Sequence, residues 1–168
     1  MHRSTAAALL ISSLLGWAAA SLAADAPPLD VQGMTFVSTR GGETDVVVHA
    51  EEARFRPAAD VADLTVVRAQ ISTGDEPGSR IAIECDEGTL NLKSNSFWAR
   101  GNVQGRTSDG REFSAPWARY DHTDGMLFTD APVVMSEAGT KIRGGGFRYY
   151  VREQRFRLLG GAEVVQEQ

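Results

Sequence analysis

The sequence contains a single cysteine, Cys85, so no disulfide can form within the chain. Cys85 follows Ile81 and Ile83 on the apolar side of an alternating pattern, which favours a buried, unreactive thiol over a redox or catalytic one. Histidines number only three, and no Gly-x-Ser-x-Gly turn accompanies the serines. The sequence therefore has few of the groups that hydrolytic sites require.

Two short segments are the remaining candidates for chemistry. His122 lies in the run Asp121-His122-Thr123-Asp124, which a metal ion could use, although a turn also favours such polar residues. Gly144-Gly145-Gly146 precedes an aromatic strand and does not open a helix, which favours a bulge or a close strand crossing over a phosphate loop. We predict a solvated turn at residues 121–124, and neither a metal nor a cofactor.

Acidic residues outnumber basic ones, 22 to 17, which gives a net charge of −5. This balance provides no general attraction to nucleic acid or to an anionic membrane. Basic side chains nevertheless gather near the C-terminus: Lys141, Arg143, Arg148, Arg152, Arg155 and Arg157. They could face an anionic group, but several alternate with apolar residues, which favours the solvated face of a sheet.

A long apolar run occurs only at the N-terminus. Residues 1–24 carry one charge, Arg3, followed by nineteen residues that hold no charge. Small residues at its end are typical of a cleaved secretory signal, while its length would just span the ~30 Å hydrocarbon core as a helix. The many alanines favour cleavage, but both alternatives stay open. Either way, we expect the rest of the chain to be exported.

The remainder is predicted to be one domain. Residues 25–33 contain Pro27-Pro28 and read as a short tether, and residues 34–168 fit a single folded unit. From residue 34 onward, apolar and polar residues alternate as in strands. Gly41-Gly42, Asp109-Gly110 and Asp124-Gly125 are typical hairpin turns. The sequence predicts an all-β domain.

One spacing recurs along this domain: a small or apolar residue, a second three positions later, and a larger apolar residue two further. The copies are Ala50-x-x-Ala53-x-Phe55, Cys85-x-x-Gly88-x-Leu90, Ala115-x-x-Ala118-x-Tyr120 and Gly144-x-x-Phe147-x-Tyr149. Their first members lie 35, 30 and 29 residues apart. Such a period is typical of stacked structural units, here of strands.

Each predicted strand has only one apolar side, so the sheet must bury that side against itself or shelter another molecule. The small residues of the repeat predict a roomy interior, walled by Phe55, Leu90 and Tyr120. Each buried CH₂ of a lipid tail contributes ~0.8 kcal/mol, so ten would contribute on the order of 8 kcal/mol before ordering costs. The alternative is that the same residues form a closed core, and composition does not separate the two.

In their order and spacing these residues resemble the LptC family of lipopolysaccharide-export proteins and, more loosely, the LptA/OstA-like group. The segments that carry the resemblance are VVVHAEEARF (46–55), IECDEGTL (83–90), ARGNV (99–103), FSAPWARY (113–120), TDAPV (129–133) and IRGGG (142–146). The resemblance as a whole covers about residues 34–165.

The resemblance implies a twisted, open, V-shaped antiparallel β-jellyroll, preceded by an apolar helix. Its interior would hold the acyl chains of lipopolysaccharide, with Ala50, Phe55, Cys85, Leu90, Ala115, Tyr120 and Phe147 as the lipid-binding residues. The family accepts lipid from the LptB2FG ABC transporter at the inner membrane and passes it to LptA by edge-strand pairing. Strands 147–151 and 157–165 would offer that edge. The ATP hydrolysis is the transporter's, so no catalytic residue is implied.

Two features depart from the family pattern. The cleavage-like end of the N-terminal segment leaves a soluble, LptA-like bridge protein open beside a membrane-tethered periplasmic one. The acidic balance implies that lipid recognition would rest on acyl chains. A structural or adaptor β-domain with a closed core is a further alternative, and an enzyme centred on His122 and Asp124 has little support.

Overall fold

The computed structural model describes residues 26–74 and 76–166, and within them almost all of the regular structure is β-strand. The strands are β1 (Leu29–Arg40), β2 (Glu43–Arg56), β3 (Val61–Ser72), β4 (Arg80–Asn91), β5 (Ser96–Thr107), β6 (Glu112–Asp121), β7 (Met126–Thr129), β8 (Val133–Glu137), β9 (Thr140–Tyr150) and β10 (Arg155–Gln166). One short 3₁₀ helix, η1 (Pro57–Ala59), joins β2 to β3. The predicted all-β class is confirmed. The predicted N-terminal helix and the segment 1–24 lie outside the described residues.

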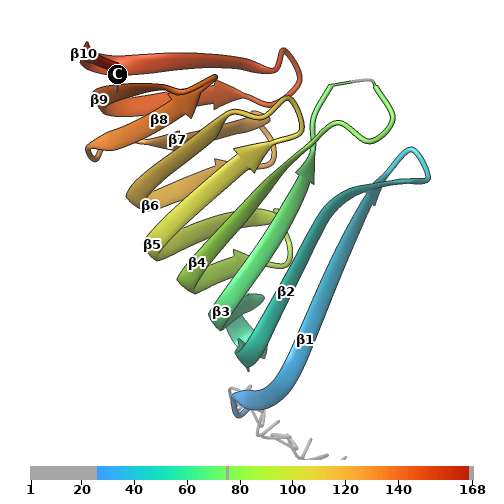
Figure 1. The fold of residues 1–168 in the computed structure, drawn as a ribbon. Coiled ribbons are helices and arrows are strands. Elements are labelled where there is room, and N and C mark those ends of the chain that lie inside the picture. Colours follow the sequence, from blue (N-terminus) through green and yellow to red (C-terminus); the bar gives the residue numbers. More distant parts are fainter. Residues whose placement is uncertain (1–25, 75, 167–168) are drawn as a thin grey trace, which may run out of the picture.

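The strands form one antiparallel sheet in nearly sequential order, β1-β2-β3-β4-β5-β6-β7-β9-β10, with β8 beside β6 and β9. Figure 1 shows this stack running from β1 in blue to β10 in red. Tight turns allow the order, as at Gly41 and Gly42, whose φ angles of 61° and 89° suit residues without a Cβ. In the described sheet, β1 and β10 are therefore the two edges.

Bulges interrupt the pairing near the middle of the long strands. The register shifts between Glu84 and Glu87 on β4, and between Arg100 and Val103 on β5. In both places the extra residue lies on β5, between Arg100 and Gln104, and the buried residues Ala99 and Val103 on either side are four positions apart. On β2, β4 and β6 the buried residues step by three at the same level, as in the sequence repeat, although the β2–β3 and β3–β4 pairings show no register shift. We call this level the bulge line.

Residues 144–146 are predicted to form a bulge or a close strand crossing. The extra residue lies on β10, where Gly160 and Gly161 oppose Gly145, and a Cβ on Gly145 would lie 3.3 Å from Gly160, which matches the close approach.

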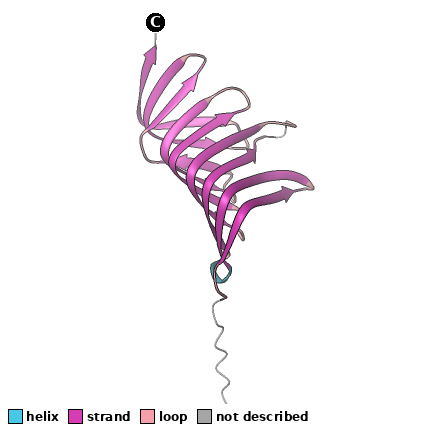
Figure 2. Cartoon of the chain, turned by 60° about the horizontal axis from the view of Figure 1, so that its bottom comes forward, coloured by secondary structure: helices cyan, strands magenta, loops and turns pink. Residues whose placement is uncertain are grey.

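The bulge line divides the sheet into two halves. Half-sheet A comprises residues 34–40, 43–50, 67–72, 80–85, 103–107, 112–115, 133–137, 140–144 and 162–166, and half-sheet B comprises residues 29–32, 52–56, 61–65, 87–91, 96–100, 117–121, 126–129, 146–150 and 155–159. Their inner faces meet, because the ring centroid of Phe113 in A lies 4.7 Å from that of Phe147 in B. Figure 2 shows the strands bending along their length.

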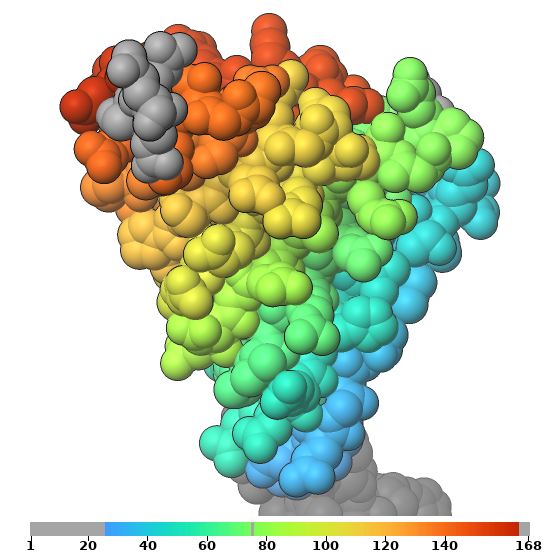
Figure 3. All heavy atoms as spheres, in the orientation of Figure 1, coloured from blue at the N-terminus to red at the C-terminus, as the bar shows by residue number. Residues whose placement is uncertain are grey.

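The apolar core lies between the two half-sheets. Its four largest fully buried side chains are aromatic, and all of them belong to half-sheet B: Phe97, Tyr120, Phe147 and Tyr149. The described atoms form a wedge that narrows toward the start of β1 and the β2–β3 turn (Figure 3). Since β1 begins at Leu29, residues 29–33, predicted as tether, are the first part of the sheet.

Candidate functional site

All seven predicted interior residues lie on the inner faces of the half-sheets. Ala50, Cys85 and Ala115 belong to half-sheet A, and Phe55, Leu90, Tyr120 and Phe147 belong to half-sheet B. Six of them are buried, and Phe55 is half-buried. The structure therefore brings them into one shared interior, although sequence spacing alone did not reveal that they come from two facing halves.

The small residues of the repeat lie at the bulge line, where the half-sheets converge. A Cβ added to Gly88 would lie 2.6 Å from the ring of Phe97 and 3.3 Å from a methyl group of Val67. The prediction that these small residues leave open volume is therefore wrong at Gly88. Glycine is required there because side chains from both halves already fill the space.

Cys85 is buried in this interior, as predicted. Its thiol donates a hydrogen bond to the carbonyl oxygen of Glu87, at 3.1 Å. Burial raises the pKa of the Cys85 thiol to about 11, because the thiolate would lose its hydration. Little thiolate therefore exists at neutral pH, which matches an unreactive cysteine.

The apolar interior reaches solvent at both ends of the strand stack. At the β1 end Leu29 is 57% exposed, and at the β10 end Val164 is 60% exposed. Each lies directly opposite an inner-face residue, Phe55 and Ile142 respectively, and so shares that face. Further inner residues near the two ends are only partly buried: Val31, Met34, Phe36, Phe156 and Leu158. The packed apolar interior thus extends from one unpaired edge to the other and is exposed at both; we call it the channel, although its own side chains fill it.

Only one of the two predicted edge segments is an edge. Phe147–Tyr150 belongs to β9, which pairs with β7 and β8 on one side and with β10 on the other. The prediction that residues 147–151 offer a free edge is therefore wrong. β10, which contains the second predicted segment, has one neighbour and leaves one row of backbone groups unpaired.

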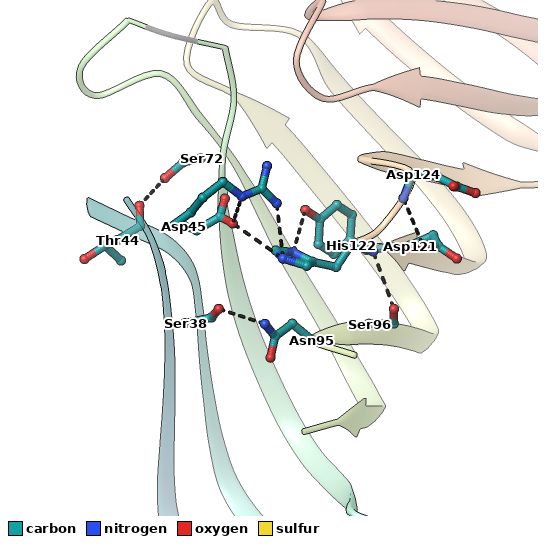
Figure 4. A network of polar contacts seen from close by, with 11 residues as sticks. Ser38, Thr44, Asp45, Ser72, Asn95, Ser96, Asp121, His122 and Asp124 are labelled. Carbon is teal, nitrogen blue, oxygen red and sulfur yellow. Dashed lines mark hydrogen bonds and ion pairs between the residues drawn. The ribbon is translucent and has the colours of Figure 1, made fainter. Parts of the chain in front are cut away.

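Between the two ends, polar contacts join the tips of the half-sheets. We call four of them the rim contacts: Asn95 Nδ2 to Ser38 Oγ at 2.9 Å, Arg40 to His122 Nε2 at 3.1 Å, Gln154 Nε2 to the Thr73 carbonyl at 3.5 Å, and Arg111 to the Gln154 carbonyl at 3.5 Å. Figure 4 shows the group around His122. Each contact links half-sheet A, or a turn at its tips, to a turn of half-sheet B. Together they close the long side of the channel.

His122 is the centre of this group. Its side chain is 18% exposed and lies 3.7 Å from the carboxylate of Asp45, which also lies 3.1 Å from Arg40 Nε. The hydroxyl of Tyr120 is 3.3 Å from His122 Nδ1. The segment does form the predicted turn, with Asp121 accepting a hydrogen bond from the Asp124 amide. The prediction that it is simply solvated is wrong for His122, because the imidazole bridges the two halves.

The cavities of the surface lie outside the apolar interior. One of about 640 Å³ opens on the outer side of β1–β5, and half of its lining residues are charged, including the ion pair of Arg54 with Asp30. Another, of about 470 Å³, lies at the rim and includes Arg40, Asp45 and Tyr120. Of these two cavities, the one at the rim brings solvent closer to the interior, because the buried Tyr120 is among its lining residues.

Neither a metal site nor a spanning helix is found in residues 26–74 and 76–166. These residues contain no cluster of three or more histidine, cysteine or carboxylate side chains placed to hold a metal ion. Likewise, none of their helices has the length and apolar character needed to cross a bilayer.

Comparison with protein families decides the relationship. The family described as "Lipopolysaccharide-assembly, LptC-related" matches residues 5–167. The chain belongs to this family. The match covers both half-sheets, and it confirms the resemblance read from the repeat. LptC-related proteins are non-enzymatic components of lipopolysaccharide transport in the periplasm, so the enzymatic interpretation of His122 and Asp124 is set aside.

A solved structure has a similar fold. It is the crystal structure of LptH, the LptA-homologous periplasmic component of the lipopolysaccharide transport device from Pseudomonas aeruginosa. The TM-score is 0.58 at 13% identity, and the alignment covers 73% of this chain and 95% of LptH. At this identity the likeness shows that the LptC-related chain shares the LptA-like fold. Comparison with individually curated proteins gives no match.

Proposed function

We propose that this LptC-related chain carries the acyl chains of lipopolysaccharide between its two half-sheets, accepting the lipid from LptB2FG and passing it to LptA. The observation that supports this most directly is the apolar opening at each end of the channel, beside Leu29 on β1 and Val164 on β10. A closed domain would cover such inner-face residues. Here they lie where a second sheet could continue the channel.

Lipid binding in this proposal requires the half-sheets to separate into an open V. The inner side chains now fill the space between them, so acyl chains must replace contacts of the half-sheets with each other. Each methylene buried contributes ~0.8 kcal/mol, so a few tails offset the loss of several rim hydrogen bonds at ~1 kcal/mol each. The rim contacts then hold the empty channel shut without preventing loading.

The two edge strands would provide the docking surfaces. β1 and β10 each have one paired side, and an added strand from a partner would satisfy the remaining backbone groups. We propose that β10 pairs with LptA and that β1 faces the transporter. Such pairing would place the apolar openings of neighbouring proteins end to end, so that lipid passes from one channel to the next.

Photo-crosslinking in cells tests this function. A photoreactive residue at Leu29, Leu90, Tyr120 or Val164 is expected to capture lipopolysaccharide, and one at the outward-facing Glu84 is not. Leu29 and Val164 keep the test informative if substitution at the buried positions impairs folding. Capture from Glu84 alone, with none from the two ends, would refute the proposal.

The membrane tether is a second part of the proposal. We propose that residues 1–24 are either retained as an inner-membrane anchor or removed to leave a soluble, LptA-like bridge protein, with residues 34–168 as the functional domain. The mass of the mature protein distinguishes the two. A mass without residues 1–24, together with recovery in the periplasmic fraction, would refute the tethered form and favour the bridge.

A closed adaptor domain is the competing function, and the nearly complete burial of the middle strands favours it. Ala115→Trp separates the two, because the bulky ring must either be accommodated by opening of the half-sheets or disrupt the core. If the half-sheets open, the variant stays folded and loses lipid capture at Tyr120. Unfolding of Ala115→Trp, together with no capture at Leu29, would favour the adaptor.

A further inference from the structure

Half-sheet B carries an unusual outer face. Reading straight across neighbouring strands β5, β6, β7, β9 and β10, the paired residues are Trp98, Arg119, Phe128, Arg148 and Arg157. Residues paired in this way point to the same side of a sheet. The register thus places three arginines and two aromatic rings in one outward row, with Trp117 beside them. We call these six residues the arginine–aromatic face.

The aromatic rings of this face form one connected cluster. Trp117 makes edge-to-face contacts with Trp98 at 6.4 Å and with Phe128 at 6.2 Å between ring centroids. Trp98 is nevertheless 43% exposed, and the guanidinium of Arg100 lies 5.1 Å from the centroid of its ring. The cluster is therefore fixed in position before any partner arrives, and it presents an indole to solvent.

The arginines of this face lack acidic partners in the described part of the chain. No carboxylate there pairs with Arg119, Arg148 or Arg157, although all three are exposed. Half-sheet A offers a contrast. On its outer face Arg68 lies 3.6 Å from Glu84, Arg106 lies 2.5 Å from Glu112, and Arg143 lies 3.8 Å from Glu163.

This local arrangement differs from what the net charge of −5 suggests. Half-sheet B also has ion pairs, at Arg54, Arg56 and Arg100, but the three guanidinium groups of Arg119, Arg148 and Arg157 stay uncompensated within a few strands of each other. Neighbouring strands lie ~4.8 Å apart, so the three arginines span about 15 Å. A single small anion could meet one of them, whereas an extended array of phosphates could meet all three.

We propose that the arginine–aromatic face docks onto the surface of an anionic phospholipid bilayer. Guanidinium groups bind phosphate in a fork geometry, and exposed tryptophan favours the boundary between headgroups and acyl chains. The apolar run at residues 6–24, if retained, would hold the domain near a bilayer. This inference goes beyond the lipid channel, since the face lies on the opposite side of half-sheet B from the interior.

The tryptophans of the face provide the test. The chain has three tryptophans, and a Trp17→Phe background leaves only Trp98 and Trp117, both on the face. The full chain in this background is reconstituted into vesicles of phosphatidylglycerol or of phosphatidylcholine, so that the N-terminal segment brings it to both surfaces. With phosphatidylglycerol, we expect a blue-shifted emission, protection from acrylamide, and loss of both in high salt.

Two triple variants sharpen the result. Arg119→Gln with Arg148→Gln and Arg157→Gln is expected to weaken the docking about fivefold per arginine, on the order of 100-fold in total. Arg68→Gln with Arg106→Gln and Arg143→Gln changes the net charge equally on the other face and should leave docking unchanged.

Three outcomes would overturn the proposal. The first is equal protection in both kinds of vesicle, and the second is an equal loss in the two triple variants. The third is stronger protection by soluble polyglutamate than by phosphatidylglycerol, which would assign the face to an acidic protein instead.

Discussion

The inner apolar residues of this sheet are buried on the middle strands and exposed on the edge strands. Leu90, in the middle of the stack, is 0% exposed, while Leu29 on β1 is 57% exposed. Both residues point into the channel between the half-sheets. The middle strands have neighbours on both sides that cover their inner residues, and the edges have a neighbour on one side only. The burial that stabilises the fold is therefore concentrated in the middle of the stack, and the ends contribute less of it.

The largest expected effect contrasts these two leucines. Leu90→Ala removes a fully buried side chain and should lower the free energy of unfolding by about 2–5 kcal/mol. Leu29→Ala makes the same chemical change at the open end and should cost less than about 1 kcal/mol, while reducing lipopolysaccharide capture there. Urea denaturation measures both. Equal losses of stability would show that the end is as closed as the middle.

A smaller effect is expected from the rim. The double variant Asn95→Ala with His122→Ala removes hydrogen bonds between the half-sheets and should lower the free energy of unfolding by about 1–2 kcal/mol. It should also raise lipid capture by a crosslinker at Tyr120, because the channel opens more easily. Arg54→Ala is the matched control, since it removes an exposed ion pair within half-sheet B. The same rise in capture in that control would contradict a closing role of the rim.

Two buried ionisable groups, Cys85 and Tyr120, predict that the free energy of unfolding falls at alkaline pH. Burial raises the pKa of Cys85 from 9.0 to about 11 and that of Tyr120 from 10.0 to about 12. Because both values are raised by folding, their stabilising effect is complete below pH 9 and is lost as the pH rises through 11 to 12. The free energy of unfolding should therefore fall above pH 9, by at most about 1.4 kcal/mol per pH unit for each group.

Urea unfolding at pH 8 and pH 11 measures this decline. Cys85→Ala should make it shallower, because this variant has no thiol to ionise. An identical decline in the Cys85 variant would show that the thiol does not contribute.

The smallest effect on stability is expected at the β10 edge. Val164→Lys places a charge on an exposed inner position and should change the free energy of unfolding by no more than about 0.5 kcal/mol. A lysine on an edge strand disfavours pairing with another strand, so co-purification with LptA should be lost. Retention of LptA by this variant would argue against docking at β10.

Part of this architecture is predictable from the sequence because it depends on local patterns. Alternation, glycine turns and the recurring three-residue step indicate strands, hairpins and repeated units. The repeat also marks the level at which the strands change the face that they bury, although its meaning becomes clear only in the structure. At Gly88 the same spacing misleads. It does not tell whether the volume beside a small residue stays open or is filled by another side chain, as the ring of Phe97 fills it here.

The rest depends on contacts between distant parts of the chain. Arg40 and His122 are 82 residues apart, and nothing in the turn Asp121–Asp124 indicates a partner on the first hairpin. The arginine–aromatic face likewise needs the register of five strands before its residues align. The identity of the free edge required the strand order, which places β9 between neighbours and β10 at the end.

The bulge line also determines what opening the channel would cost. Backbone hydrogen bonds of the sheet run within half-sheet A or within half-sheet B, and the bulges interrupt them at the junction. The opening that we propose would therefore be a rotation of the two half-sheets about the bulge line, with the strands themselves left continuous. In the proposed lipid loading, such a hinge would leave every β-ladder in place, and only side-chain packing and the rim contacts would be given up.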